Sequence, residues 1–192
     1  MCKTGQTLQA TWDVITTISS SDHGRFYACC CLHATLRNFP SFFDDKLSSI
    51  CQLLCISLSE RKRLLCEAAA QTATVFIGIF EKELEDSNVI VKSLLEACKS
   101  DTSSSLLFYL TELLNTTRES EELFDDAFPF LMTVLTSGSL ELRVASLSAL
   151  SALASGSTVK INVHFTSLFS LLFDLLQSTN EIFEQLKPPA IE

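Results

Sequence analysis

Apolar side chains recur every three or four positions along most of the chain, which is the spacing of one face of an α-helix. Near the start, four apolar residues follow this spacing before a run of serines interrupts it: Leu8, Trp12, Ile15 and Ile18. The pattern therefore predicts a helix over 7–19.

The same reasoning predicts about nine or ten helices, separated by Ser, Asp, Gly or Asn clusters that supply caps and turns. Pro40 is expected to introduce the third helix, and Pro129 to bend or restart the seventh. The fourth helix, over 59–84, is expected to be the longest. The other helices are expected over 23–38, 40–58, 89–99, 106–114, 120–136, 140–155 and 159–177, with a stub over 181–186.

A repeat emerges when the second helices of successive helix pairs are superposed. Small or apolar residues then coincide at Ala28, Ala68, Leu107 and Ala145, with separations of 40, 39 and 38 residues. A period of about 39 residues made of two helices falls in the range of armadillo and HEAT units, which bury their apolar faces only by stacking on neighbours. We infer four units and a remnant.

The stretch 128–155 carries a family resemblance. Its first helix contributes Pro129, Phe130, Leu131, Val134 and Leu135, and its second runs Leu140-Glu141-Leu142-Arg143-Val144-Ala145 with Leu147, Leu150 and Leu153. These 28 residues resemble a HEAT or armadillo repeat, with Gly138-Ser139 where the family usually has Asp in the turn. The resemblance implies an all-α fold: an α-solenoid of stacked antiparallel helix pairs, with 1–192 as a single domain.

The resemblance also bears on function. Nuclear-import armadillo receptors hold basic peptides with a ladder of Trp and Asn, but here Trp12 is followed by Thr16, which argues against that role. Large scaffolds of this kind that act in meiotic break formation or nuclear complexes are broadly similar in their Leu, Ser and Cys usage. The resemblance therefore implies protein docking rather than catalysis.

The last predicted helix pair is incomplete. Its first helix carries an apolar stripe that a second helix would cover, yet Pro188-Pro189 follows it. We expect the solenoid to be truncated at its C-terminal end, with Phe169 and Phe173 left as candidate partner-binding residues.

Charge narrows the choice of partner. The net charge of −9 should repel phosphate backbones and favour basic partners. Five acidic residues near the start of the seventh helix are candidates for a partner-binding strip: Glu119, Glu121, Glu122, Asp125 and Asp126. The compact basic run Arg61-Lys62-Arg63 is the basis of an alternative, a small nucleic-acid-binding patch, although a solvated turn is the simpler interpretation.

The chemistry-bearing residues favour a structural interpretation. The eight cysteines lie mostly in apolar helical segments, as reduced core thiols do, and this usage predicts an intracellular protein, cytoplasmic or nuclear. Cys29, His33, Cys51 and Cys55 could form a zinc site across two helices, but core packing is the simpler interpretation. The chain lacks G-x-S-x-G, G-x-G-x-x-G, Walker and H-E-x-x-H motifs, so we expect no enzyme, cofactor, metal or small-molecule substrate. We also expect no membrane-spanning helix.

The sequence thus predicts a non-enzymatic protein–protein interaction scaffold within a larger complex, for example a nuclear, meiotic or chromosome-associated one. Its partners are expected to carry basic or amphipathic-helix segments. Two alternatives stay open: a structural fragment or short isoform of a larger solenoid, and a nucleic-acid-associated protein that uses Arg61, Lys62 and Arg63.

Overall fold

A computed structural model describes residues 3–84, 87–117 and 120–185 of the chain. Within these residues it contains nine α-helices, one short 3₁₀ helix and no strand, so the predicted all-α class is confirmed. The helices are α1 (Lys3–Ile18), α2 (Asp22–Asn38), η1 (Pro40–Phe43), α3 (Leu47–Ser59), α4 (Arg63–Phe80), α5 (Ser87–Ser100), α6 (Ser104–Thr116), α7 (Ser120–Ser137), α8 (Leu140–Gly156) and α9 (Thr158–Gln185).

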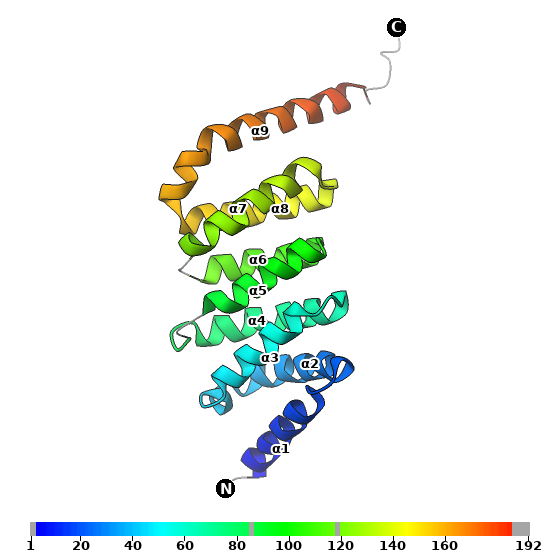
Figure 1. Ribbon diagram of the computed structural model, residues 1–192, viewed down its shortest axis with the longest axis vertical. Helices are drawn as coiled ribbons and strands as arrows, with labels where there is room; N and C mark the ends of the chain where they lie inside the picture. Colours follow the sequence, from blue (N-terminus) through cyan, green and yellow to red (C-terminus); the bar gives the residue numbers. More distant parts are fainter. Residues whose placement is uncertain (1–2, 85–86, 118–119, 186–192) are drawn as a thin grey trace.

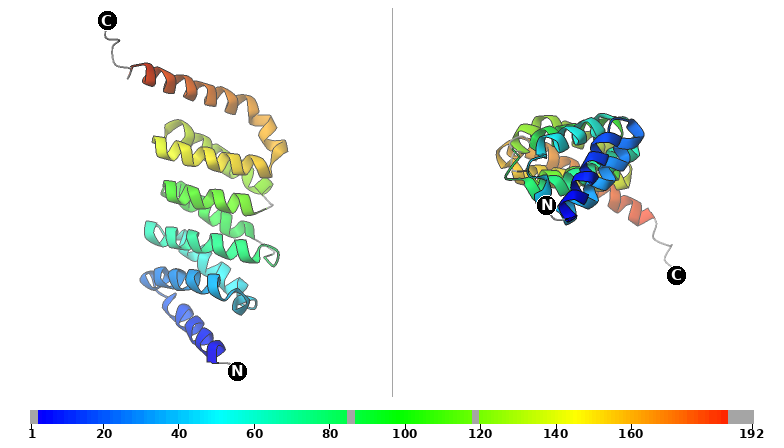
Figure 2. Two further views of the ribbon diagram at one scale, coloured as in Figure 1. Left: turned by 180° about the vertical axis from the view of Figure 1, so that it is seen from behind. Right: turned by 90° about the horizontal axis from the view of Figure 1, so that it is seen from below.

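The helices are stacked along the long axis of the molecule, from α1 at one end to α9 at the other (Figure 1). The even-numbered helices pack in the order α2, α4, α6 and α8, and the odd-numbered ones in the order α3, α5, α7 and α9. We call these two sets the even layer and the odd layer. Each even helix from α2 to α8 also contacts the helix that precedes it in the chain (Figure 2).

The core lies between the two layers, because the helices from α2 to α8 turn apolar residues inward. The four repeat positions found in the sequence all fall on even helices: Ala28, Ala68, Leu107 and Ala145. Ala28 and Leu107 are fully buried, and Ala68 and Ala145 are partly buried against the same core. Small or apolar residues at these positions let the even helices approach one another closely.

Serine side chains begin three of the helices. Ser21, Ser103 and Ser139 each accept a hydrogen bond from a backbone N–H in the first turn that follows, at 3.2, 3.3 and 3.4 Å. Such caps satisfy donors that the helix itself leaves without partners. The polar clusters read from the sequence as helix boundaries therefore fulfil that role here.

The turn between α7 and α8 explains the glycine at position 138. A Cβ on Gly138 would lie 2.5 Å from the Val134 carbonyl oxygen, so the chain passes too close to α7 for a side chain. Arg143 donates from Nε to the Gly138 carbonyl at 2.8 Å and from Nη2 to the Thr136 carbonyl at 3.1 Å. The guanidinium thereby satisfies carbonyls at the C-terminal end of α7.

The predicted helix over 59–84 is wrong at both ends. Ser59 ends α3, and α4 begins only at Arg63 and ends at Phe80. Glu60 and Lys62 have extended backbone conformations. Their side chains pair with Arg25 and Asp22 of α2, both at 2.7 Å, which holds this turn against the neighbouring repeat. Contacts with residues 35 and 40 positions away thus override the local helix preference.

Four further expectations need correction. The longest helix described is α9, with 28 residues, and not α4, with 18. Pro40 starts the 3₁₀ helix η1, and α3 begins only at Leu47. Pro129 neither ends nor restarts α7, because buried Phe128 and Leu131 on either side keep that helix packed on the core. Residues 181–185 continue α9 instead of forming a separate stub, and 186 lies outside the described residues.

One helix, α4, is long and apolar enough by length and composition to cross a membrane. Half of it is buried inside the protein, where it packs between α2 and α6. Buried core helices often meet the same length and hydropathy criteria, so this test alone is weak evidence of a membrane span.

Candidate interaction surfaces

The predicted acidic strip is only partly described. Glu119 lies outside the described residues, and the side chain of Glu121 is not described. Glu122, Asp125 and Asp126 are exposed in the first turns of α7. Asp125 forms an ion pair with Lys160 at the start of α9, with 2.7 Å between Oδ2 and Nζ. This acidic side chain therefore helps to hold α9 against α7.

The two predicted aromatic anchors are exposed on α9. Phe169 and Phe173 retain 59% and 52% of their surface in solvent, and Phe165, one turn earlier, retains 57%. A spacing of four residues places the three rings in one row along the helix. Phe169 and Phe173 lie more than two turns beyond Lys160, so these two predicted anchors and the acidic residues do not form one site.

The inner face of α9 explains why this row stays exposed. His164 stacks on Phe128 and Phe124 of α7, with ring centroids 4.5 and 5.8 Å apart. Ile161 and Leu168 are partly buried against the core on the same side. The apolar sector of α9 is wider than the surface of α7 and α8 that it packs against. The three phenylalanines at the edge of that sector therefore stay in solvent.

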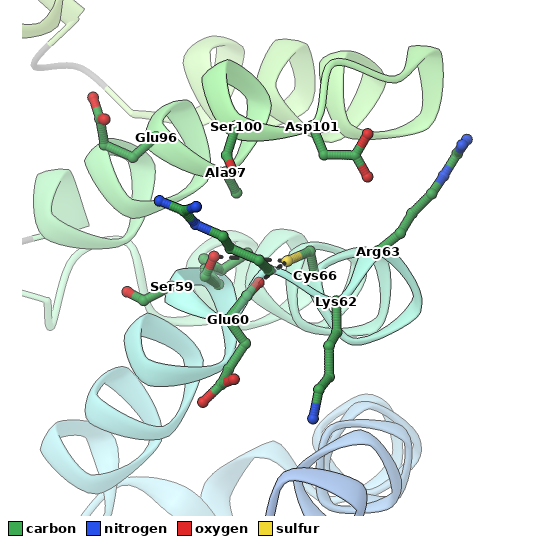
Figure 3. A pocket seen from close by; sticks show the side chains of 11 residues that line it. Ser59, Glu60, Lys62, Arg63, Cys66, Glu96, Ala97, Ser100 and Asp101 are labelled. Carbon is green, nitrogen blue, oxygen red and sulfur yellow. Dashed lines mark hydrogen bonds between the residues drawn. The ribbon is translucent and has the colours of Figure 1, made fainter.

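Two of the three cations of the basic run, Lys62 and Arg63, pair with different carboxylates instead of converging. Lys62 Nζ pairs with Asp22 at 2.7 Å and Arg63 Nε with Glu67 at 3.1 Å. Figure 3 shows these two side chains pointing in different directions around a cavity of about 250 Å³, which Glu60, Glu96 and Asp101 also border. The ion pair and hydrogen bond from Lys62 lower the pKa of the Asp22 carboxyl. Cations already paired with carboxylates bind phosphate poorly.

A first apolar groove lies on the even layer between α2 and the start of α4. Tyr27 and Leu64 expose 62% and 71% of their surface there, and Phe26 and Leu65 contribute to the lining. The groove has a volume of about 500 Å³. Its charged rim is mixed, because Asp22, Lys62 and Arg63 all border it.

A second groove, of about 440 Å³, lies on the even layer between α6 and α8. Phe108 and Val144 form its apolar floor and expose 56% and 60% of their surface. Its charged side chains are Glu112 and Glu141. We call this surface the α6–α8 groove.

Hydroxyls in the first turn of α6 tie the even layer together. Ser105 Oγ donates to Glu67 of α4 at 2.6 Å, and Ser104 Oγ donates to Glu141 of α8. The hydrogen bond from Ser105 is the main cause of the lowered pKa of Glu67. These ties cross from one repeat to the next on both sides of α6, which fixes the spacing of the helices that border the groove.

The described cysteines are free thiols that differ in burial: some lie in the core, some are partly buried and two are exposed. Burial raises the pKa of Cys98 to about 12 and that of Cys29 to about 11. Cys29 Sγ lies 3.7 Å from Ser57 Oγ, whereas Cys30 and Cys31 are exposed. Among the described residues no three His, Cys, Asp or Glu side chains gather where they could hold a metal ion. The thiols with raised pKa values stay neutral and poorly reactive at pH 7.

Sequence reasoning missed both grooves on the even layer. A signal was present in α8, where apolar residues occupy more than one face: Leu140, Val144 and Leu147 are exposed while Leu150 and Leu153 are buried. A helix that is apolar on two faces commonly contacts a second surface.

Comparison with family models, curated proteins and solved structures found no match for this chain. The resemblance to armadillo and HEAT repeats therefore rests on the chain's own residues and on its helix spacing. Function has to be argued from the surfaces described above.

Proposed function

We propose that this protein is an armadillo/HEAT-type α-solenoid that acts as a non-enzymatic protein–protein interaction scaffold within a larger complex. The observation that carries the proposal is the rows of large apolar side chains left in solvent on an otherwise well-packed helical stack. Isolated exposed apolar residues are ordinary, but rows at helical spacing are typical of docking surfaces.

The repeat assignment has two supports beyond the 39-residue period. Even helices pack on even helices and odd helices on odd ones, as stacked helix pairs require. Polar ties also recur between neighbouring repeats, from Lys62 to Asp22 over 40 residues and from Ser105 to Glu67 over 38. The stack thereby gains an extended surface whose parts keep fixed distances.

The partner chemistry follows from charge and shape. The chain carries −9 overall, so basic segments are attracted from a distance and acidic ones are repelled. Grooves between parallel helices and exposed aromatic rows accept the apolar face of an amphipathic helix. We propose partners with basic or amphipathic-helix segments, met in the cytoplasm or the nucleus, where exposed thiols such as Cys30 and Cys31 stay reduced.

A second candidate function is that of a structural segment of a larger helical assembly. The exposed row Phe165, Phe169 and Phe173 favours it, because such a row would be covered if further helices stacked on α9. Direct nucleic-acid binding through Arg61, Lys62 and Arg63 is the weakest alternative, since Lys62 and Arg63 are paired with carboxylates.

Size-exclusion chromatography with light scattering, followed by affinity capture from nuclear and cytoplasmic extracts, tests the proposal. A docking scaffold should elute as a defined species and recover the same partner in near-stoichiometric amounts. A variant with Phe169→Asp and Phe173→Asp separates the surfaces, because it changes α9 and leaves the even layer intact. A well-behaved chain that recovers only chaperones would contradict the scaffold proposal, and a chain that aggregates until the α9 row is made polar would favour the structural segment.

A further inference from the structure

The α6–α8 groove has a regular distribution of charge along its length. At one end of the groove, Glu141 lies beside Ser104, the first residue of α6. Glu112 lies toward the other end, and Phe108 and Val144 form the floor between the two glutamates. The lining spans positions 104 to 112 on α6, which at the rise of an α-helix is about 12 Å. The surface therefore presents a carboxylate, an apolar floor and a second carboxylate in sequence.

No cation among the described residues neutralises either carboxylate. Glu141 accepts a hydrogen bond from the neutral Ser104 hydroxyl, and neither Glu141 nor Glu112 forms an ion pair within the described residues. The nearby Arg143 is occupied with the carbonyls of Gly138 and Thr136. The groove thus keeps two unneutralised negative charges beside an exposed apolar floor on a protein of net charge −9.

We propose that the α6–α8 groove binds a basic amphipathic helix of a partner protein, with apolar side chains on Phe108 and Val144 and a cationic side chain at each end. The inference rests on the proposed docking function and specifies its site and ligand. Two turns of helix span about 11 Å, so cations seven or eight residues apart would meet Glu141 and Glu112 together. Apolar residues three or four positions from each would face the floor.

A second copy of this chain fits the groove poorly. The exposed apolar helix that the protein itself could offer is α9, whose described side chains between 158 and 177 include only Lys160 as a cation. Lys160 is already paired with Asp125. Nucleic acid is excluded from the groove by the same two carboxylates.

The first apolar groove, between α2 and the start of α4, provides a contrast within the same protein. It is of similar size and also apolar, but Lys62 and Arg63 border it together with Asp22. A ligand chosen for apolar area alone would bind either groove. A basic helix should prefer the α6–α8 groove, because the mixed and paired charges at the other rim attract cations less than two carboxylates do.

The test is a selection from a displayed library of helical peptides on the purified chain, followed by fluorescence anisotropy with the enriched sequences. We expect enriched peptides to be amphipathic with Lys or Arg at both ends of the apolar stripe. Val144→Asp should weaken their binding about tenfold or more, as should Phe108→Ser. Glu112→Lys should weaken it too, and added salt should reduce the affinity of the unchanged protein.

Two matched controls locate the effect. Ile56→Asp places a carboxylate on a similarly exposed apolar residue of α3, in the odd layer, and should leave binding unchanged. Glu122→Lys reverses a charge in the predicted acidic strip on α7, outside the groove, and should also leave it unchanged. Thermal unfolding of every variant, followed by circular dichroism, distinguishes a loss of folding from a loss of binding.

The inference is overturned if the library yields no binder, if enriched peptides lack basic residues, or if Val144→Asp leaves their affinity intact. Loss of binding with Phe169→Asp and not with Val144→Asp would move docking to α9; the scaffold function would then survive without this groove. If the protein captures a partner from extracts but enriches no helical peptide, the scaffold function survives and binding of a helix in the α6–α8 groove is contradicted.

Discussion

The pair α6 and α8 and the helix α9 are close in the chain but packed very differently. Five leucines of α6 are buried, and α8 buries five residues from Ser146 to Leu153. None of the α9 side chains that the structure describes is buried, although α9 is the longer helix and carries as many large apolar residues.

The difference shows that helical pattern and burial are separate properties. α6 and α9 both have the periodicity of an amphipathic helix, yet α6 packs against α4, α5 and α8, whereas α9 has α7 and α8 on one side. A stripe without a neighbour stays in solvent whatever its periodicity. We therefore assign stability to the buried faces of α6 and α8, and exposed apolar surface to α9 and to the α6–α8 groove.

Removing a leucine from each region gives the largest contrast. Leu110→Ala should lower the free energy of unfolding by about 2–5 kcal/mol, because Leu110 is fully buried and its loss leaves a cavity. Leu168→Ala on α9 should cost less than about 1.5 kcal/mol, since that side chain is only partly buried. Urea denaturation followed by circular dichroism measures both. Equal losses would mean that α9 is packed as firmly as the stack.

Ser146→Ala sharpens the assignment within the stack. Ser146 Oγ donates a buried 2.6 Å hydrogen bond to the Leu131 carbonyl and so joins α8 to α7. We expect a loss of about 1 kcal/mol in the free energy of unfolding. Ser148→Ala is the matched control, because the exposed Ser148 hydroxyl bonds only within α8. A loss for Ser148→Ala as large as that for Ser146→Ala would contradict the role given to the bond between helices.

Lys160→Ala tests how α9 is attached. The ion pair with Asp125 is partly exposed, so its removal should cost about 0.2–1 kcal/mol, and less at high salt. The local effect should be clearer than the global one: limited proteolysis within α9 should become faster while α6 and α8 stay protected. Unchanged proteolysis would indicate that the packing of His164 on Phe124 and Phe128 holds α9 alone.

Phe169→Ser should have the smallest effect on stability, within about 0.5 kcal/mol, because its ring is mostly in solvent in the folded protein. Binding of an apolar fluorescent dye to the folded protein should fall, since one ring of the exposed row is lost. A marked loss of stability would show that the row is covered in solution, for example by self-association.

Much of the fold could be predicted from the sequence because its determinants are local. Helical periodicity and serine caps at Ser103 and Ser139 place several helix starts within a few residues. The break between α3 and α4 could not be predicted in this way. It depends on Asp22 and Arg25, which meet Lys62 and Glu60 only after the repeats have stacked.

Some of the candidate surfaces could likewise be predicted from the sequence, and others could not. The exposure of Phe169 and Phe173 was predictable from the apolar stripe of the helix that carries them. The α6–α8 groove was not, because Phe108 and Val144 come from different helices and both look like core residues in the sequence. The pairing of Asp125 with Lys160 was equally hidden, since it joins residues 35 positions apart.

Hydrogen–deuterium exchange on the free protein tests most directly the central claim, that a rigid stack presents exposed surfaces. The account predicts that backbone amides of α6 and α8 exchange slowly, near the limit set by global unfolding, while those of α9 exchange much faster. Comparable exchange in α6, α8 and α9 would contradict it, because the grooves would then lack the fixed helix spacing on which docking depends.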